Sequence, residues 1–238
     1  MTLVIEVMIV KQTSGSAKKF ENPSRTPRIF ENKGKKLTYL VMGDSTSAGQ
    51  GAEYEKGIAV LTAQHLAKTY RVTMINTSIS GAVTKELLTD QISILKEIKP
   101  DVVLLSIGAN DVTHTTNVKS LEKDLSEVID RLIAHNCDVK IILTGSPDMG
   151  AIEKFLFPLS WIVGLRTNIV NSVFNNIVFK YTATLAPIAE KTGPLFRADR
   201  SLFAADGYHP NERGYAIWIP VLTDAIDTAI RSQLSRCR

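Results

Sequence analysis

The sequence predicts a three-layer α/β/α domain with a mostly parallel central sheet of about five strands. Four short apolar runs alternate with segments of helical periodicity, which is the pattern of parallel strands joined by crossover helices. The runs are apolar on both faces, as strands covered by helices on each side are. The chain has 238 residues, 44% of them hydrophobic and 22% charged, values typical of one soluble α/β domain with appendages.

The elements can be placed in order along the chain. The strand candidates are residues 37–42, 72–76, 102–107 and 139–143, and the helix candidates between them are 58–70, 84–99 and 118–135. After residue 147 the pattern weakens. An apolar stretch with an internal proline, residues 155–163, precedes a predicted helix over 165–185, and an amphipathic helix over 214–234 closes the chain.

Residues 1–36 are predicted to be a basic leader or linker, and residues 37–238 the domain proper. The leader carries eight Lys/Arg against three Glu, whereas the other 202 residues carry 20 positive and 21 negative charges. A neutral body gives no electrostatic reason to expect nucleic acid as a partner. The leader is predicted to be a solvated segment that need not be ordered, with contact to anionic lipid or nucleic acid as the alternative.

The cysteine and histidine pattern favours neither a redox nor a metal site. Cys137 and Cys237 lie a hundred residues apart, and the four histidines are scattered, so no metal and no cofactor is expected. A disulfide cannot be argued from this spacing, and a reducing compartment, the cytoplasm, is the more economical expectation. Residues 1–10 are apolar apart from Glu6, which is too short to span a bilayer and lacks the basic start of a secretory signal.

A motif whose residue types are suited to catalysis or binding follows each predicted strand. Gly43-Asp44-Ser45 follows the first, Ser80-Gly81 the second, Gly108-Ala109-Asn110-Asp111 the third, and Gly145-Ser146-Pro147-Asp148 the fourth. Ligands of open parallel sheets bind outside the carboxyl ends of the strands. We therefore expect these four loops to meet at one edge of the sheet.

One serine, one histidine and one carboxylate in these strings can form an activated nucleophile. Asp206 and His209 share one loop, so the carboxylate can reach Nδ1 of the imidazole while Nε2 faces a partner, for which Ser45 is the candidate. Taken alone, Asp44-Ser45 also fits a helix N-cap, and Asp206 to His209 fits a turn before a helix.

Together these strings resemble the SGNH hydrolase superfamily, the GDSL-type lipases and esterases, over residues 37–234. Thr46 stands where that family usually has leucine. The resemblance implies a flavodoxin-like sheet and a Ser45-His209-Asp206 triad that cleaves carboxylic esters through an acyl-enzyme. It also implies an oxyanion hole of the Ser45 and Gly81 N–H groups and the Asn110 side chain. From the residues alone, Gly81 also fits a plain turn glycine and Asn110 a turn-forming side chain.

The substrate stays open at this stage. A lipid ester, a short-chain acyl ester or an O-acetyl sugar all fit, and a thioester hydrolase, an acyltransferase or a non-catalytic binding module on this fold are the alternatives. Asp44, Phe155 and Trp161 are the predicted substrate contacts. The stretch 155–163 would wall an acyl pocket or touch a membrane, and a helix packed on the sheet or a dimer contact would explain it equally well. The oligomeric state is not predicted.

Overall fold

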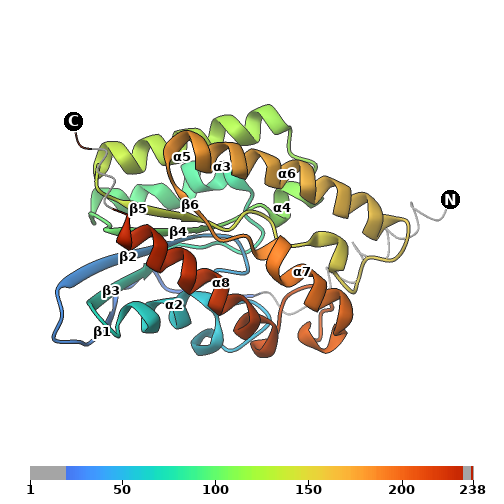
Figure 1. Ribbon diagram of the computed structural model, residues 1–238, viewed down its shortest axis with the longest axis horizontal. Helices are drawn as coiled ribbons and strands as arrows, with labels where there is room; N and C mark the ends of the chain where they lie inside the picture. The colour runs from blue at the N-terminus through green and yellow to red at the C-terminus, as the bar shows by residue number, and fades with distance from the viewer. Residues whose placement is uncertain (1–19, 233–236, 238) are drawn as a thin grey trace.

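The computed structural model describes residues 20–232 and residue 237, which form one twisted sheet between two layers of helices (Figure 1). Five strands are parallel: β2 (Lys36–Gly43), β3 (Arg71–Asn76), β4 (Val102–Ser106), β5 (Lys140–Leu143) and β6 (Thr184–Leu185). A sixth strand, β1 (Arg28–Phe30), pairs antiparallel with β3. The strand order is β1-β3-β2-β4-β5-β6, so the five parallel strands follow the flavodoxin-like order 2-1-3-4-5. The predicted fold class is confirmed.

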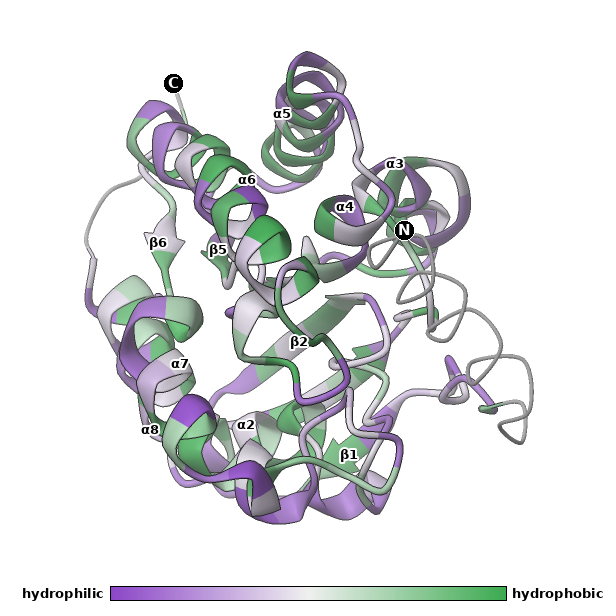
Figure 2. Ribbon diagram, turned by 90° about the vertical axis from the view of Figure 1, so that its right-hand side faces the viewer, coloured by the Kyte–Doolittle hydropathy of each residue, from purple (hydrophilic) through white to green (hydrophobic). Residues whose placement is uncertain are grey.

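The helices divide between the two faces of the sheet (Figure 2). One layer holds α3 (Thr84–Glu86), α4 (Ala109–Thr113), α5 (Val118–His135) and α6 (Leu159–Tyr181), and the other holds α2 (Ile58–Leu66), α7 (Ile188–Ala198) and α8 (Glu212–Arg231). The central strand β4 is buried at every position, because helices cover both of its faces. No helix among the described residues is long and apolar enough to cross a membrane.

Several elements differ from their predicted form. The helix predicted over 84–99 is the single turn α3 followed by a π-helical turn (Leu87–Gln91) and a 3-10 turn (Ile92–Lys96). Helix α6 begins six residues earlier than predicted, and its last predicted residues belong to β6. The sequence did not predict β1, β6 or α7. The end of the helix predicted over 214–234 lies partly outside the described residues.

The described part of the leader is joined to the domain. Arg28, Ile29 and Phe30 pair with Met74, Thr73 and Val72 of β3, and Arg71 forms an ion pair with Glu31. The chain therefore packs against the sheet before the predicted boundary at residue 37. The strand β1 thus lies within the predicted leader, while residues 1–19 lie outside the described residues.

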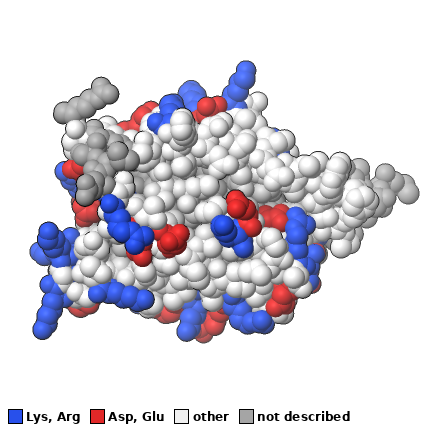
Figure 3. Space-filling model, viewed as in Figure 1, with Lys and Arg blue, Asp and Glu red and all other residues white. Residues whose placement is uncertain are grey.

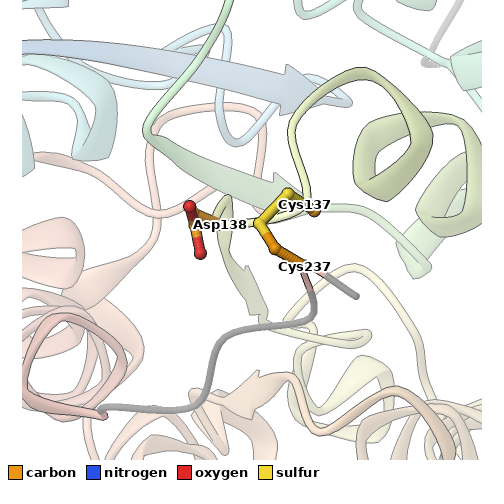
Figure 4. Close-up of side chains that lie close together, drawn as sticks. All are labelled: Cys137, Asp138 and Cys237. Atoms are coloured by element: carbon orange, nitrogen blue, oxygen red, sulfur yellow. A yellow bond between two sulfur atoms is a disulfide. The ribbon is translucent and has the colours of Figure 1, made fainter.

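A disulfide joins Cys137, in the turn between α5 and β5, to Cys237 near the end of the chain (Figure 4). The sequence spacing did not reveal this pair because the two cysteines meet only through the packing of α8 against β5. Among the described residues, the one cluster of potential metal ligands is Cys137, Asp138 and Cys237. Both of its sulfurs are used in the disulfide, and a disulfide sulfur is not the thiolate that binds metals.

Candidate active site

The turn after β2 places Ser45 at the carboxyl edge of the sheet. Gly43 ends the strand with φ +153°, and a Cβ atom there would lie 1.9 Å from the Ser106 carbonyl oxygen of β4. Only glycine allows this close approach of the two backbones. The buried side-chain amide of Gln91 accepts from the Gly43 N–H and donates to the Gly43 carbonyl oxygen, each at 2.8 Å. One side chain thereby holds both polar backbone groups of Gly43, at the end of the strand that precedes the nucleophile.

The loop between α7 and α8 carries the other two members of the predicted triad. Asn211 caps α8 by accepting from the Arg213 and Gly214 N–H groups, and its Nδ2 donates to the Ser201 and Phe203 carbonyl oxygens. These bonds close the loop that bears Asp206 and His209. Asparagine suits this position because its side chain both accepts and donates.

The structure brings Ser45, His209 and Asp206 into one hydrogen-bonded line. His209 Nε2 lies 2.9 Å from Ser45 Oγ, and His209 Nδ1 lies 2.6 Å from Asp206 Oδ2. The Ser45 and His209 side chains are largely shielded from solvent, at 6% and 8% residue exposure. With Nδ1–H donating to the carboxylate, Nε2 is the free acceptor for the serine proton.

The environment keeps Asp206 ionised. Burial alone would raise its pKa, but hydrogen bonds from His209 Nδ1 and from the Tyr208 and His209 N–H groups outweigh burial and lower the pKa to about 2. The carboxylate therefore remains charged at neutral pH, as the partner of an imidazole that becomes protonated must be.

Gly81 and Asn110, the predicted oxyanion donors, come from the next two loops of the same edge. Gly81 is exposed, has φ +86°, and occupies a corner of the turn closed by the Ala82 N–H and the Ile79 carbonyl oxygen. Asn110, in the first turn of α4, donates from Nδ2 to the Ala82 carbonyl oxygen at 3.0 Å. Its neighbour Asp111 accepts from the Thr84 N–H and hydroxyl. These bonds tie α4 to the Gly81 turn.

None of the three predicted substrate contacts lines the cavity that contains Ser45. Asp44 is 1% exposed, and its carboxylate accepts from the Thr46 N–H and hydroxyl. Phe155 is buried with its ring edge-on to Tyr208. Trp161 is exposed and lines a separate groove of about 670 Å³ between α6 and α7. Asp44 and Phe155 are therefore buried, and Trp161 lines a different groove from the one at Ser45.

The cavity that Ser45 and His209 do line is narrow, at about 30 Å³. Its walls come from distant parts of the chain and are mostly apolar, and include Met149, Ile152, Phe196, Phe203, Tyr208 and Trp218. Of these, Tyr208 stood inside the Asp206–His209 string and was the one wall residue that the motif itself displayed. The others carry no local signal, because each is an ordinary apolar residue of a helix or turn.

Known proteins are similar to this chain in sequence and in fold. The model of the GDSL-like lipase/acylhydrolase family matches residues 41–217, which include Ser45, Gly81, Asn110, Asp206 and His209. The chain belongs to the GDSL-like lipase/acylhydrolase family. The predicted resemblance is thereby confirmed for most of the domain, and the leader lies outside the match.

Curated relatives of this GDSL-like protein are esterases. It is 31% identical to esterase TesA of Pseudomonas aeruginosa over 180 residues, 73% of this chain and 79% of that protein. It is 28% identical over 202 residues to a GDSL-like esterase of Mycobacterium tuberculosis, covering 82% of this chain. The aligned region spans 63% of the length of that esterase.

Solved structures share the fold of this family member along nearly their whole length. The crystal structure of TesA has a TM-score of 0.67 at 22% identity and covers 81% of this chain and 99% of its own. The psychrotrophic esterase EstA from a Pseudoalteromonas species has a TM-score of 0.64 at 23% identity, covering 82% of this chain and all of its own. Phospholipase A1 from Streptomyces albidoflavus has a TM-score of 0.65 at 20% identity and covers 79% and 99%.

Proposed function

We propose that this GDSL-like protein is a serine ester hydrolase that works through an acyl-enzyme on Ser45. The observation that carries the proposal is the 2.9 Å contact between His209 Nε2 and Ser45 Oγ, with Asp206 on the other ring nitrogen. A non-catalytic binding module has no use for a serine held against an imidazole–carboxylate pair. Family membership and the esterase relatives support the same conclusion.

The reaction follows from this geometry. Ser45 Oγ bonds to the ester carbonyl carbon while His209 Nε2 accepts the hydroxyl proton, and Asp206 stabilises the imidazolium. The bond to the alcohol oxygen then breaks, and His209 returns the proton to the departing alcohol. Water attacks the acyl-enzyme, gives one proton to His209, and the carboxylic acid leaves as Ser45 regains its proton.

The developing negative charge on the carbonyl oxygen requires donors. We assign this role to the Ser45 and Gly81 N–H groups and to Asn110 Nδ2, which lie on three neighbouring loops at the same edge of the sheet. Each well-placed donor is typically worth ~3 kcal/mol in the transition state. Asn110 retains one N–H beyond the one it gives to the Ala82 carbonyl.

The test of the proposal is the loss of Ser45. Replacing Ser45 by Ala should lower the turnover of short-chain aryl esters by at least ~1000-fold and abolish labelling by a fluorophosphonate, because the nucleophile is removed. The matched control is Ser172→Ala, since the Ser172 hydroxyl is exposed and bonds only within α6. Undiminished hydrolysis by Ser45→Ala with an intact fold would refute the proposal.

The substrate class is a finer proposal. We infer that the ester is presented from a lipid surface and that the loop before α6, with the first turns of that helix, contacts it. Leu156, Phe157 and Trp161 are 66%, 77% and 61% exposed, and no charged residue occurs from Phe155 to Leu165. Figure 3 shows a broad surface over α6 with few charged side chains. Exposed apolar patches of this kind mark interaction sites.

The position of this apolar loop links it to the catalytic loop. The Lys154 N–H donates to the Gly207 carbonyl oxygen at 3.1 Å, and the Phe155 ring meets Tyr208 edge-on at 5.9 Å between centroids. A lipid surface touching Leu156 and Phe157 would thus lie beside the site. Membrane contact through the basic leader stays a prediction. The thioester hydrolase and acyltransferase alternatives also stay predictions, and a panel of oxyesters and thioesters with water or alcohol acceptors would separate them.

A further inference from the structure

The described part of the leader contacts the turn that carries Gly81. Before β1, residues 20–27 carry two prolines, which restrict the backbone, and the Arg25 guanidinium donates to the Asp90 carbonyl oxygen at 3.0 Å. Ahead of this anchor, Asn22 Oδ1 accepts from the Ser80 N–H at 2.7 Å. A residue outside the segment that the family model matches therefore contacts the neighbour of Gly81.

Ser80 is held from a second side by the nucleophile's own turn. Its hydroxyl donates to Gln50 Oε1 at 2.7 Å. The Gln50 N–H donates to the Ser45 carbonyl oxygen at 2.9 Å, and the Gln50 carbonyl oxygen accepts from the Tyr215 hydroxyl of α8. The contacts from Ser80 through Gln50 to Ser45 therefore set the distance between the turn that carries Gly81 and the turn that carries Ser45. Each of these turns offers one oxyanion donor.

The turn that carries Gly81 has few other contacts to hold its corner. The bond between the Ala82 N–H and the Ile79 carbonyl oxygen, together with φ +86° at Gly81, identifies a type II turn with Ser80 and Gly81 as its central residues. Gly81 is exposed and a Cβ atom there would meet nothing within 4 Å. The position of Ser80 sets the direction of the Gly81 N–H, because this N–H is part of the peptide group that joins the two residues.

We propose that Asn22 is a positioning residue for the oxyanion hole: by accepting the Ser80 N–H, it holds the corner of the turn against Gln50 so that the Gly81 N–H faces the substrate oxygen. The inference rests on the proposed ester hydrolysis. Oxyanion donors act only when fixed in advance of the reaction, and small displacements at such positions lower the rate steeply. The leader thus contributes to catalysis through Gly81 without touching the substrate.

The experiment compares three variants of the full chain on a soluble aryl ester. Asn22→Leu removes the acceptor at similar size, and we expect kcat to fall about tenfold with KM nearly unchanged. Asn22→Asp retains an acceptor oxygen and should keep kcat within about twofold. Ser24→Ala is the matched control in the same segment, because the Ser24 hydroxyl bonds only with Thr26. The rate of Ser45 phosphonylation should fall in parallel with kcat.

The outcomes separate this inference from the proposed function. An active wild type that depends on Ser45, with Asn22→Leu equal to wild type in kcat, overturns the role of Asn22 alone. Equal losses in Asn22→Leu, Asn22→Asp and Ser24→Ala, or a melting temperature that falls together with kcat, also overturn it, because these results describe a structural role. A wild type without esterase activity overturns both proposals.

Discussion

The carboxyl group of Asp44 is buried next to the nucleophile, and burying its charged form lowers the stability of the fold. Burial raises its pKa to about 6, against the lowering effect of the hydrogen bonds from Thr46. The folded protein therefore binds a proton that the unfolded chain, with an Asp pKa near 3.9, releases. Stability from this group is present below about pH 4 and is lost as the pH rises through 6.

Replacing Asp44 by Asn should therefore stabilise the protein at high pH. The Asn oxygen can accept the same bonds from Thr46, while the cost of burying a charge disappears. We expect a gain of about 1–3 kcal/mol in the free energy of unfolding at pH 8 and almost none at pH 4. Urea unfolding at both values measures it, and Asp130→Asn, an exposed change on α5, is the control. Equal effects of Asp44→Asn at both pH values would contradict the raised pKa.

At the residue level, the sequence predicted the functional residues that lie within short motifs and missed those that act only through tertiary packing. Ser45, Asp206 and His209 stand beside glycines or prolines just after or before regular elements, so their loops could be located. Gln91 gave no signal, because an amide in a run of helical periodicity looks like any surface residue. Its function appears only when the turn buries it against Gly43.

Helix α6 shows why an element can be predicted while its role is not. Its inner positions, such as Val170, Phe174 and Ile177, are buried, and their spacing predicts the helix. Its outer face also carries apolar side chains, so periodicity alone could not say where the helix begins or which face is exposed. The short elements β1 and β6 have three and two residues, too few for any pattern, and α7 contains Gly193 and Pro194, which normally end a helix.

The exposed end of α6 should bind phosphatidylcholine vesicles. Trp161 is exposed and the other tryptophan, Trp218, is buried, so a blue shift of the fluorescence on adding vesicles reports on Trp161. The double change Leu156→Ser and Phe157→Ser should weaken binding about tenfold, because it removes the two most exposed apolar groups of the loop. Hydrolysis of a soluble ester should stay unchanged.

The matched control for this experiment lies at the other end of the same helix. Phe179 is 91% exposed, so Phe179→Ser removes a comparable apolar group from a surface remote from the loop. Equal loss of vesicle binding in this variant would show non-specific adsorption. The absence of any fluorescence shift in the wild type would refute the lipid contact.

At the scale of the whole molecule, the disulfide between Cys137 and Cys237 ties the end of the chain to the start of β5, across a sequence separation of 100 residues. Disulfides persist in oxidising compartments, so this bond weighs against the expected cytoplasmic location, which stays a prediction. Closing a long loop restricts the unfolded chain and typically stabilises a protein by about 2–4 kcal/mol.

Reduction should therefore lower the melting temperature of the wild type. The double variant Cys137→Ser and Cys237→Ser should melt at the temperature of the reduced wild type and should not respond to reductant. Esterase activity at room temperature should survive in both, since neither cysteine adjoins the cavity at Ser45. A wild type whose melting temperature is the same with and without reductant would contradict the stabilising role of the bond.

The contact between Ser45 and His209 spans 164 positions of the chain. The nucleophile follows the first parallel strand, β2, whereas its base precedes α8, which must pack on the sheet before the imidazole can reach the hydroxyl. During synthesis, the emerging polypeptide thus carries an unactivated Ser45 until His209 and helix α8 have left the ribosome. Ester cleavage therefore reports that α8 has packed, and a truncated or trapped intermediate has no esterase activity even when most of its sheet has formed.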